Sequence, residues 1–195
     1  RKDQYGGDIE GKARFPLQVL KSVRNRVGSD FPIICRLSGD EYVEGGLRIE
    51  ETKKIAKFLE KGGANALHIS ACNAASVYLN HPSYYVEEGV FIHLAQAIKN
   101  EVNIPVIAVG RIRHPAMADQ VIGEGKADMI SMGRALIADP HLPNKAKEGR
   151  LDEIIPCISC NKCIQTLRED SVRCTVNPET GNEGQFKFSL DAPTD

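Results

Sequence analysis

The sequence predicts an α/β fold in which helices cover a parallel β-sheet. Apolar residues recur at helical spacing in some segments and form short uninterrupted runs in others, and the two kinds of segment alternate along the chain. The short runs are apolar on both faces, which is typical of parallel strands buried between layers. This pattern fits both an open doubly wound sheet and a (β/α)8 barrel.

Four helix–strand units account for the alternation. In the first unit a helix over residues 13–27 ends at Gly28, and its apolar face carries Phe15, Val19, Val23 and Val27. Each unit closes with a short apolar strand, and the four expected strands are 33–37, 66–70, 104–109 and 128–132. The pattern changes after Pro140 to a short charged helix at 144–149 and then to a cysteine-rich segment. We therefore expect one domain over 1–150 and a second over 151–195.

Length and charge restrict the kind of protein. The 195 residues, 42% of them hydrophobic, can bury a core, but a complete (β/α)8 barrel typically needs about 250 residues. We therefore expect the C-terminal half of a barrel, truncated at its N-terminus. A net charge of −1, from 25 basic and 26 acidic residues, predicts neither a nucleic-acid partner nor an anionic membrane. No apolar run approaches the roughly 18 residues of a membrane span. Clustered cysteines predict a reducing cytoplasm.

Two strand ends share a Gly-Arg sequence that suits phosphate binding. They are Val109-Gly110-Arg111 and Met132-Gly133-Arg134. Glycine lets the backbone N–H approach an anion, and arginine adds a charged fork. The loops after the last two strands are the usual phosphate site of the barrel class. The alternative is that each glycine merely ends a strand and each arginine is solvated or paired with a carboxylate.

Arg36 interrupts the first apolar strand. A guanidinium buried there needs an anionic partner or several acceptors. A bound ligand can supply them, and the alternative is a salt bridge to Asp40 or Glu41.

The cysteine segment carries the strongest chemical signal. Its pattern is C-x2-C-x2-C-x10-C, formed by Cys157, Cys160, Cys163 and Cys174. Three thiolates in one tight loop can each hold a different iron of a cubane cluster, and the fourth comes from a separate turn. Structural zinc is the alternative, although it normally uses two paired C-x2-C knuckles. The remaining cysteines, Cys35 and Cys72, are expected to be small core residues.

With these residues assembled, the chain resembles the old yellow enzyme family, in particular its iron–sulfur branch. That branch includes 2,4-dienoyl-CoA reductase, trimethylamine dehydrogenase and the bile-acid-inducible NADH:flavin oxidoreductases. The segments that carry the resemblance are 3–8, 14–15, 35–38, 108–112, 127–134, 138–140 and 157–163.

The resemblance implies an FMN barrel of which this chain holds strands 5–8, followed by a [4Fe-4S] segment. Arg36 would face the N1/O2 edge of the flavin, while residues 109–111 and 132–134 would hold the FMN phosphate. NAD(P)H would supply electrons, and the substrate would be an unsaturated carbonyl or thioester. The missing N-terminal half barrel would be the partner that carries the proton donor. An FAD domain outside these residues and a homo-oligomer are left open.

Departures from the family pattern leave the catalytic residues unknown. The loop over residues 71–85 lacks the Trp-His-Glu-Ala-Arg run of the dienoyl-CoA reductases. Its candidate proton donors are Tyr78, His81, Tyr84 and Tyr85, and the favoured alternative is that these are solvated loop residues without a catalytic role. The predicted function is an FMN- and [4Fe-4S]-dependent enoate or enoyl-CoA reductase. The alternatives are an amine dehydrogenase of the trimethylamine type and a noncatalytic zinc-binding fragment.

Overall fold

The computed structural model describes residues 2–167 and 171–185, and the chain forms two compact units. Unit 1 comprises residues 1–82, 86–112 and 116–131. Unit 2 comprises residues 83–85, 113–115 and 132–195. The main boundary between the two compact units therefore lies after residue 131. The expected division of the sequence into domains at residue 150 stays a prediction.

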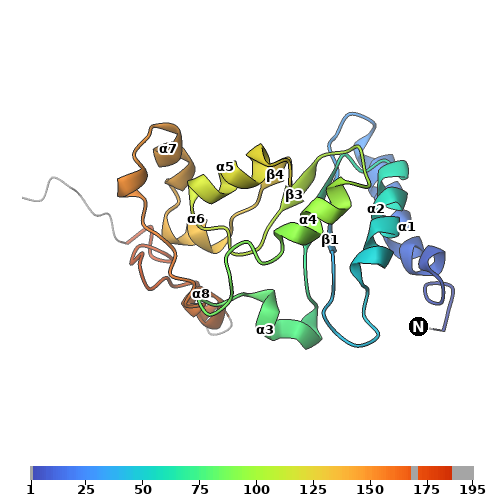
Figure 1. Ribbon diagram of the computed structural model, residues 1–195, viewed down its shortest axis with the longest axis horizontal. Coiled ribbons are helices and arrows are strands. Elements are labelled where there is room, and N and C mark those ends of the chain that lie inside the picture. Colours follow the sequence, from blue (N-terminus) through green and yellow to red (C-terminus); the bar gives the residue numbers. More distant parts are fainter. Residues whose placement is uncertain (1, 168–170, 186–195) are drawn as a thin grey trace, which may run out of the picture. The chain divides into compact units, whose positions relative to one another are not determined.

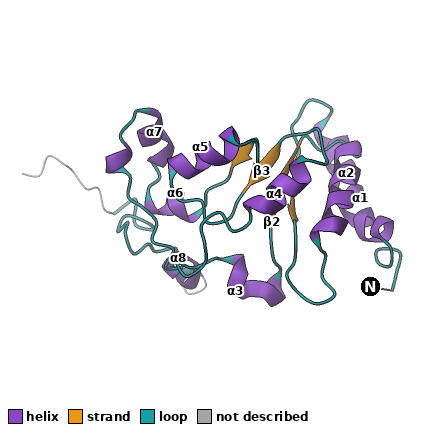
Figure 2. Ribbon diagram, in the orientation of Figure 1, coloured by secondary structure: helices purple, strands orange, loops and turns teal. Residues whose placement is uncertain are grey.

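Unit 1 is built on a four-stranded sheet (Figure 1), whose strands are orange in Figure 2. The strands are β1 (Ile34–Ser38), β2 (Ala66–Ser70), β3 (Val106–Ala108) and β4 (Met129–Ile130), in the order β1-β2-β3-β4. Every pairing is parallel, with Arg36 opposite His68 and Ala108 opposite Ile130. The predicted parallel α/β sheet is confirmed, and the strand over residues 66–70 has the predicted bounds.

Helices α2 (Ile49–Lys61) and α4 (Ile92–Lys99) pack on the sheet and on each other. The core between these elements is fully buried, with exposures of 0–2% for Leu67, Ile69, Leu94, Ile98 and Val106. The remaining helices of this unit are α1 (Ile9–Val27), the 3-10 turn η1 (Ala74–Ser76), α3 (Val77–Asn80) and α5, which begins at its border (Pro115–Gly123). Apolar faces on one side of the sheet thus hold unit 1 together.

Helix α1 starts earlier than predicted because Asp8 caps it. The Asp8 side chain accepts a 2.8 Å hydrogen bond from the Gly11 backbone N–H, which satisfies one of the free donors of the first turn. The helix ends at Gly28, as predicted, with φ at +82°.

The predicted apolar face of α1 is not buried. Phe15, Val19, Val23 and Val27 are 59%, 45%, 38% and 39% exposed. Helical spacing places these four side chains on one face, but spacing says nothing of whether a partner covers them. Ala13 and Leu20, which flank this face, supply buried contacts of the helix, and α1 packs against α2.

Unit 2 consists of short helices connected by polar contacts. These are α6 (Arg134–Ala138), α7 (Leu142–Lys147), the 3-10 turn η2 (Leu151–Glu153) and α8 (Lys162–Thr166). The predicted charged helix at 144–149 corresponds to α7, two residues earlier. No helix among the described residues has the length and apolar character that crossing a membrane requires.

Candidate cofactor-binding site

The carboxyl edge of the sheet in unit 1 carries strained backbone. Non-glycine residues with positive φ follow three consecutive strands: Tyr42 (52°) after β1, Cys72 (74°) after β2 and Arg111 (53°) after β3. Such conformations cost about 1–3 kcal/mol each and concentrate at ligand sites. A hydrogen bond joins the turns that follow β1 and β2, because the Cys72 N–H donates to the Asp40 carbonyl over 2.8 Å. The backbone at this edge is therefore preorganised in the absence of a ligand.

Gly110 is required by the turn that follows β3. Its φ is +142°, and a Cβ here would lie 3.0 Å from the backbone nitrogen and the Cβ of Phe91. Arg111 follows with its guanidinium directed to the Val86 carbonyl, to which Nη1 donates. Two successive residues with positive φ thus turn the chain away from β3 in a way that only glycine permits at the first position.

Gly133 and Arg134 leave the neighbouring strand β4 and belong to unit 2. Gly133 is the N-cap of α6, with φ at −101° and open space around its Cβ position. The Arg134 Nη1 donates to the Asn161 side-chain carbonyl, within the cysteine segment. The two Gly-Arg sequences therefore follow neighbouring strands but differ in backbone geometry.

Arg36 was predicted to be buried, and in this structure it is exposed. The reason is its position on edge strand β1, on the face shared with Ile34, which is 56% exposed. The Arg36 Nη1 lies 3.4 Å from both ring nitrogens of His68 on β2. Burial, and then the Arg36 charge, lower the pKa of His68. The imidazole beside Arg36 is therefore neutral at pH 7.

The predicted alternative partners of Arg36 are engaged elsewhere. Asp40 is 8% exposed, and its Oδ1 accepts from the Tyr42 N–H at 2.7 Å and from Arg48 at 3.1 Å. The Glu41 carboxylate accepts from the Leu47 N–H at 2.8 Å. Neither carboxylate is recorded in a salt bridge with Arg36 among the described residues.

The loop that carries the first three motif cysteines contains two left-handed residues. Ser159 has φ at 54° and Asn161 has φ at 62°, and these positions alternate with the cysteines. Such turns gather backbone N–H groups on one side, where they can bind an anion. The Ser159 N–H donates to the Cys157 sulfur over 3.4 Å, and the Lys162 N–H bonds the Cys160 sulfur.

The cysteine sulfurs lie within electrostatic range of one another. Burial raises the pKa of the Cys163 thiol, the Cys157 and Cys174 sulfurs raise it further, and Arg134 opposes them. Burial also acts to raise the pKa of Cys160, but hydrogen bonds from Thr175 and backbone N–H groups, with Arg134, leave it lowered. Thr175 Oγ1 is 3.2 Å from the Cys160 sulfur. Since Thr175 follows Cys174, this contact brings the fourth cysteine's turn to the loop.

The donor set suits a thiolate-bound group. In the part of the chain that the structure describes, no three His, Cys, Asp or Glu side chains converge in a way that would hold a metal ion. A cubane cluster places each thiolate on a different iron, so its ligands need not converge on one point. All six cysteines are free, and N–H groups face the Cys157 and Cys160 sulfurs. These observations fit a cluster by donor chemistry.

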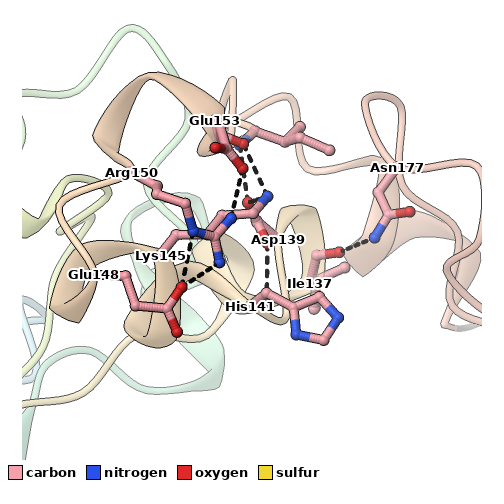
Figure 3. A network of polar contacts seen from close by, with 9 residues as sticks. Ile137, Asp139, His141, Lys145, Glu148, Arg150, Glu153 and Asn177 are labelled. Carbon is pink, nitrogen blue, oxygen red and sulfur yellow. Dashed lines mark hydrogen bonds and ion pairs between the residues drawn. The ribbon is translucent and has the colours of Figure 1, made fainter. Parts of the chain in front are cut away.

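A buried carboxylate connects the helices of unit 2 (Figure 3). Asp139 is 2% exposed and accepts from the His141 N–H at 2.9 Å, Lys145 Nζ at 2.7 Å and the Ile155 N–H at 3.0 Å. Lys145 also donates to the Glu153 carbonyl. Because Ile155 lies two residues before Cys157, Asp139 fixes the approach to the cysteine loop.

The residues considered as proton donors are not assembled into a catalytic group. Tyr78, Tyr84 and Tyr85 are 69%, 55% and 83% exposed, and Tyr84 stacks on Tyr85. A different pair, which the sequence pattern did not indicate, brings the Tyr42 hydroxyl within 3.3 Å of the His93 Nε2. These residues are 51 positions apart, so no sequence pattern indicates their contact.

Comparison with known proteins identifies the family. Residues 1–153 match the profile of the NADH:flavin oxidoreductase / NADH oxidase family. The chain belongs to this family. It is 49% identical to the NADH oxidase of Thermoanaerobacter brockii, an alignment that covers 99% of this chain and 30% of that protein.

Two solved structures of similar proteins extend the comparison. A 2-naphthoyl-CoA reductase in complex with 2-naphthoyl-CoA superposes with a TM-score of 0.88 at 34% identity, over 95% of this chain and 28% of that one. Histamine dehydrogenase from Rhizobium sp. 4-9 gives 0.86 at 29% identity, over 100% of this chain and 29% of that one. The chain thus spans less than a third of the length of these relatives of the NADH:flavin oxidoreductase family.

Replacing Gly110 with alanine should destabilise the protein, whereas Gly133→Ala should not. The first substitution forces a Cβ against Phe91 at positive φ, which we expect to cost about 1–3 kcal/mol. Gly133 has negative φ and open space, so its variant should lose less than about 1 kcal/mol. Urea unfolding of the full-length protein measures both, and equal losses would contradict the difference in backbone geometry.

Replacing Asp139 with alanine should destabilise unit 2 by about 3–5 kcal/mol, because Lys145 and two N–H groups lose a buried partner. The exposed Asp152→Ala is the control and should change stability by no more than about 0.5 kcal/mol.

The same carboxylate gives a pH dependence of known sign. Burial acts to raise the pKa of Asp139, but the hydrogen bonds from Lys145, Ile155 and His141 outweigh it and leave the pKa lowered. The Asp139 carboxylate therefore contributes fully to the free energy of unfolding above its unfolded-state pKa of about 3.9. This contribution is lost as the pH falls through the lower pKa of Asp139 in the folded state. In urea titrations at successive pH values, Asp139→Ala should lose less stability between neutral and acid pH than the wild-type protein. An unchanged acid profile would refute the assignment.

Proposed function

We propose that this chain is part of an FMN- and [4Fe-4S]-dependent oxidoreductase that passes hydride or electrons from NAD(P)H to an activated C=C bond. The observation that carries the proposal is the family match over residues 1–153, followed immediately by the four-cysteine motif. The similarity to an NADH oxidase supports NADH as the electron donor. The similarity to a cinnamate reductase and to a 2-naphthoyl-CoA reductase supports an enoate or enoyl-CoA type of substrate.

The FMN phosphate is proposed to lie where two neighbouring parallel strands end. The Ser131 N–H donates to the Ala108 carbonyl over 2.8 Å, so the segments that lead to Gly110 and Gly133 start side by side. Residues 109–111 and 132–134 would supply backbone N–H groups and two guanidinium forks. Since a guanidinium has five donors, the Arg134 contact with Asn161 is compatible with a second, phosphate contact.

Bound FMN would supply hydride transfer between a nicotinamide and the substrate. Arg36 is proposed to place its charge at the N1/O2 edge of the ring. Its exposure on the open face of the sheet leaves that face accessible to a ligand. A fixed positive charge there favours an anionic reduced flavin, and a charge-assisted hydrogen bond of this kind contributes about 1.5–3 kcal/mol. The neutral His68 adds no competing positive charge.

The cluster is proposed to be held by Cys157, Cys160, Cys163 and Cys174. It would supply one-electron transfer to and from the flavin. Support comes from the electrostatic proximity of Cys163 to Cys157 and Cys174, and from the Thr175 contact with Cys160. The six free thiols also support a reducing compartment, and we retain the cytoplasm as the proposed location.

The remainder of a (β/α)8 barrel is the proposed partner of unit 1, in which β1–β4 would be strands 5–8. A cavity of about 620 Å³ lies between α1, β1 and α2, and its lining includes Phe15, Val19 and Val23. Edge strand β1 exposes Ile34 beside it. A strand added to β1 would cover this apolar surface and its unpaired edge. That half would also carry the substrate pocket and the proton donor.

A second candidate is amine oxidation, with electrons running from substrate to flavin to cluster. Histamine dehydrogenase, at a TM-score of 0.86 over the whole chain, is the observation that favours it. The two candidates differ in the direction of electron flow and share every residue assigned above.

Introducing a charged side chain on the apolar face of α1 tests whether the remainder of the barrel buries this face. In the full-length protein Val19→Asp should destabilise the barrel, because burying a valine contributes about 1.5–3 kcal/mol and a buried carboxylate adds a penalty. Ile122→Asp on α5 is matched in exposure, at 44% against 45% for Val19, and lies outside that cavity. Urea midpoints should fall for Val19→Asp alone. Equal midpoints would contradict a covered α1.

The cofactors are tested by chemical analysis of the full-length protein. We expect FMN released by acid, together with iron and acid-labile sulfide in equal amounts. Cys157→Ala and Cys160→Ala should lose iron, while Cys35→Ala, outside the motif, should retain it. Stoichiometric zinc without iron or sulfide would refute the cluster.

Activity separates the two candidate functions. A reductase should consume NADH or NADPH anaerobically when a cinnamate or an aromatic acyl-CoA is added, and it should form the saturated product. An amine dehydrogenase should instead bleach its flavin when histamine or a methylated amine is added without NAD(P)H. Neither response in a protein that contains FMN and iron would refute both.

A further inference from the structure

Asn161 occupies an unusual place in the cysteine loop. It precedes α8 as the N-cap residue, the position at which asparagine side chains usually accept from the helix backbone. Its side chain makes no such cap, and its backbone is left-handed, with φ 62° and ψ 15°. The Asn161 Oδ1 instead accepts from the Arg134 Nη1. The side chain is therefore used for a tertiary contact.

The left-handed turn determines where a backbone donor points. The chain reverses at Asn161, so that the Lys162 N–H faces back to the Cys160 sulfur. The Asn161 carbonyl then starts α8 by accepting from the Ile164 and Gln165 N–H groups at 3.1 and 3.0 Å. Left-handed backbone is unfavourable for most side chains and is tolerated by glycine and asparagine. Asparagine at position 161 therefore permits the backbone conformation in which the Lys162 N–H faces the Cys160 sulfur.

Arg134 holds this turn from a helix that also holds the fourth cysteine's segment. It is the first residue of α6, and the Ile137 carbonyl of the same helix accepts from Thr180 Oγ1 at 3.0 Å. The same carbonyl accepts from Asn177 Nδ2 at 3.1 Å (Figure 3). One short helix thus contacts both chain segments that supply thiolates. Because Asn161 directly follows Cys160, the contact also places the Arg134 guanidinium at the cysteine loop.

We propose that Arg134 and Asn161 form a positioning pair for the cysteine site. Asn161 sets the turn that aims the Lys162 N–H at Cys160, and Arg134 anchors this turn and places a positive charge beside the sulfurs. The inference rests on the proposed cluster. It assigns to Arg134 a role distinct from phosphate binding.

The pair should control both assembly of the cluster and its reduction potential. A thiolate-bound cluster gains negative charge on reduction, and a nearby positive charge or N–H dipole stabilises the reduced state. Loss of Arg134 should therefore move the midpoint potential to a more negative value. Loss of the left-handed turn should instead impair insertion, because the N–H and the Cys160 sulfur no longer meet.

Four variants of the full-length protein separate these effects. Asn161→Gly removes the side chain but tolerates the left-handed turn, whereas Asn161→Ala removes the same contact and strains the turn. We expect Asn161→Gly to keep most of its iron and Asn161→Ala to lose at least half. Arg134→Gln should keep iron with a more negative cluster potential, and Arg134→Lys should recover part of the shift. Iron, sulfide and FMN contents are measured with an EPR-monitored redox titration.

The outcomes distinguish failure of the positioning pair from failure of the proposed cluster. Wild-type protein without iron and sulfide would refute the cluster itself. Wild-type protein with a cluster, but with equal iron in Asn161→Gly and Asn161→Ala, would overturn the role of the turn. Loss of FMN from Arg134→Gln with an unchanged cluster potential would overturn the role of the charge and leave Arg134 as a phosphate ligand only.

Discussion

Parallel pairing of β1 to β4 is the constraint on which the remainder of unit 1 depends. Parallel strands point the same way, so every connection that follows a strand begins at one edge of the sheet. The register aligns Ser38 with Ser70, which puts the turns that follow β1 and β2 next to each other. A shift of one residue would transfer Arg36 and His68 to the helix-covered face. Core packing by Leu67 and Ile69 therefore also determines where Arg36 is presented.

Unit 2 depends on polar contacts where unit 1 depends on apolar burial. Its central group is the Asp139 carboxylate, surrounded by an ammonium and two N–H groups. A buried charge is tolerated only when it is paired and hydrogen-bonded, and such groups specify geometry more strongly than apolar contacts do. This specificity would suit the proposed role of the cysteine segment, because the buried apolar residues near it, such as Ala138 and Leu142, are few and small or lie on neighbouring helices.

Sequence patterns predicted the elements better than their surroundings. The apolar runs located all four strands, since short apolar runs between helical segments leave a clear signal. The thiolate chemistry indicated by the cysteine spacing stays a prediction. The predicted burial of Arg36 was wrong for the structure of this chain. Periodicity correctly grouped the apolar residues of α1 on one face, but it does not identify the partner that covers such a face. The start of α1 was missed because Asp8 caps it from within a turn-rich segment.

The contacts of the cysteine site could not be predicted for a different reason. Arg134 and Asn161 are 27 positions apart, and nothing in their spacing predicts a contact. The one available signal was the asparagine between closely spaced cysteines, because asparagine is several-fold enriched at left-handed positions. The same limit applied to Asp139, whose three donors come from different segments.

Gathering thiolates in one place has an electrostatic cost that the surrounding protein must offset. The Cys157 and Cys174 sulfurs each act against ionisation of Cys163, and burial adds to this effect. Among the described residues, the Arg134 charge and the Ile164 N–H oppose it at Cys163, while the Thr175 hydroxyl, backbone N–H groups and Arg134 act in the same sense at Cys160. Backbone dipoles have the advantage of being fixed by the fold, so they need no reorganisation when charge is added. The strain of two left-handed non-glycine residues, Ser159 and Asn161, is then the conformational cost of orienting those dipoles, and it explains why this segment is tied so closely to α6.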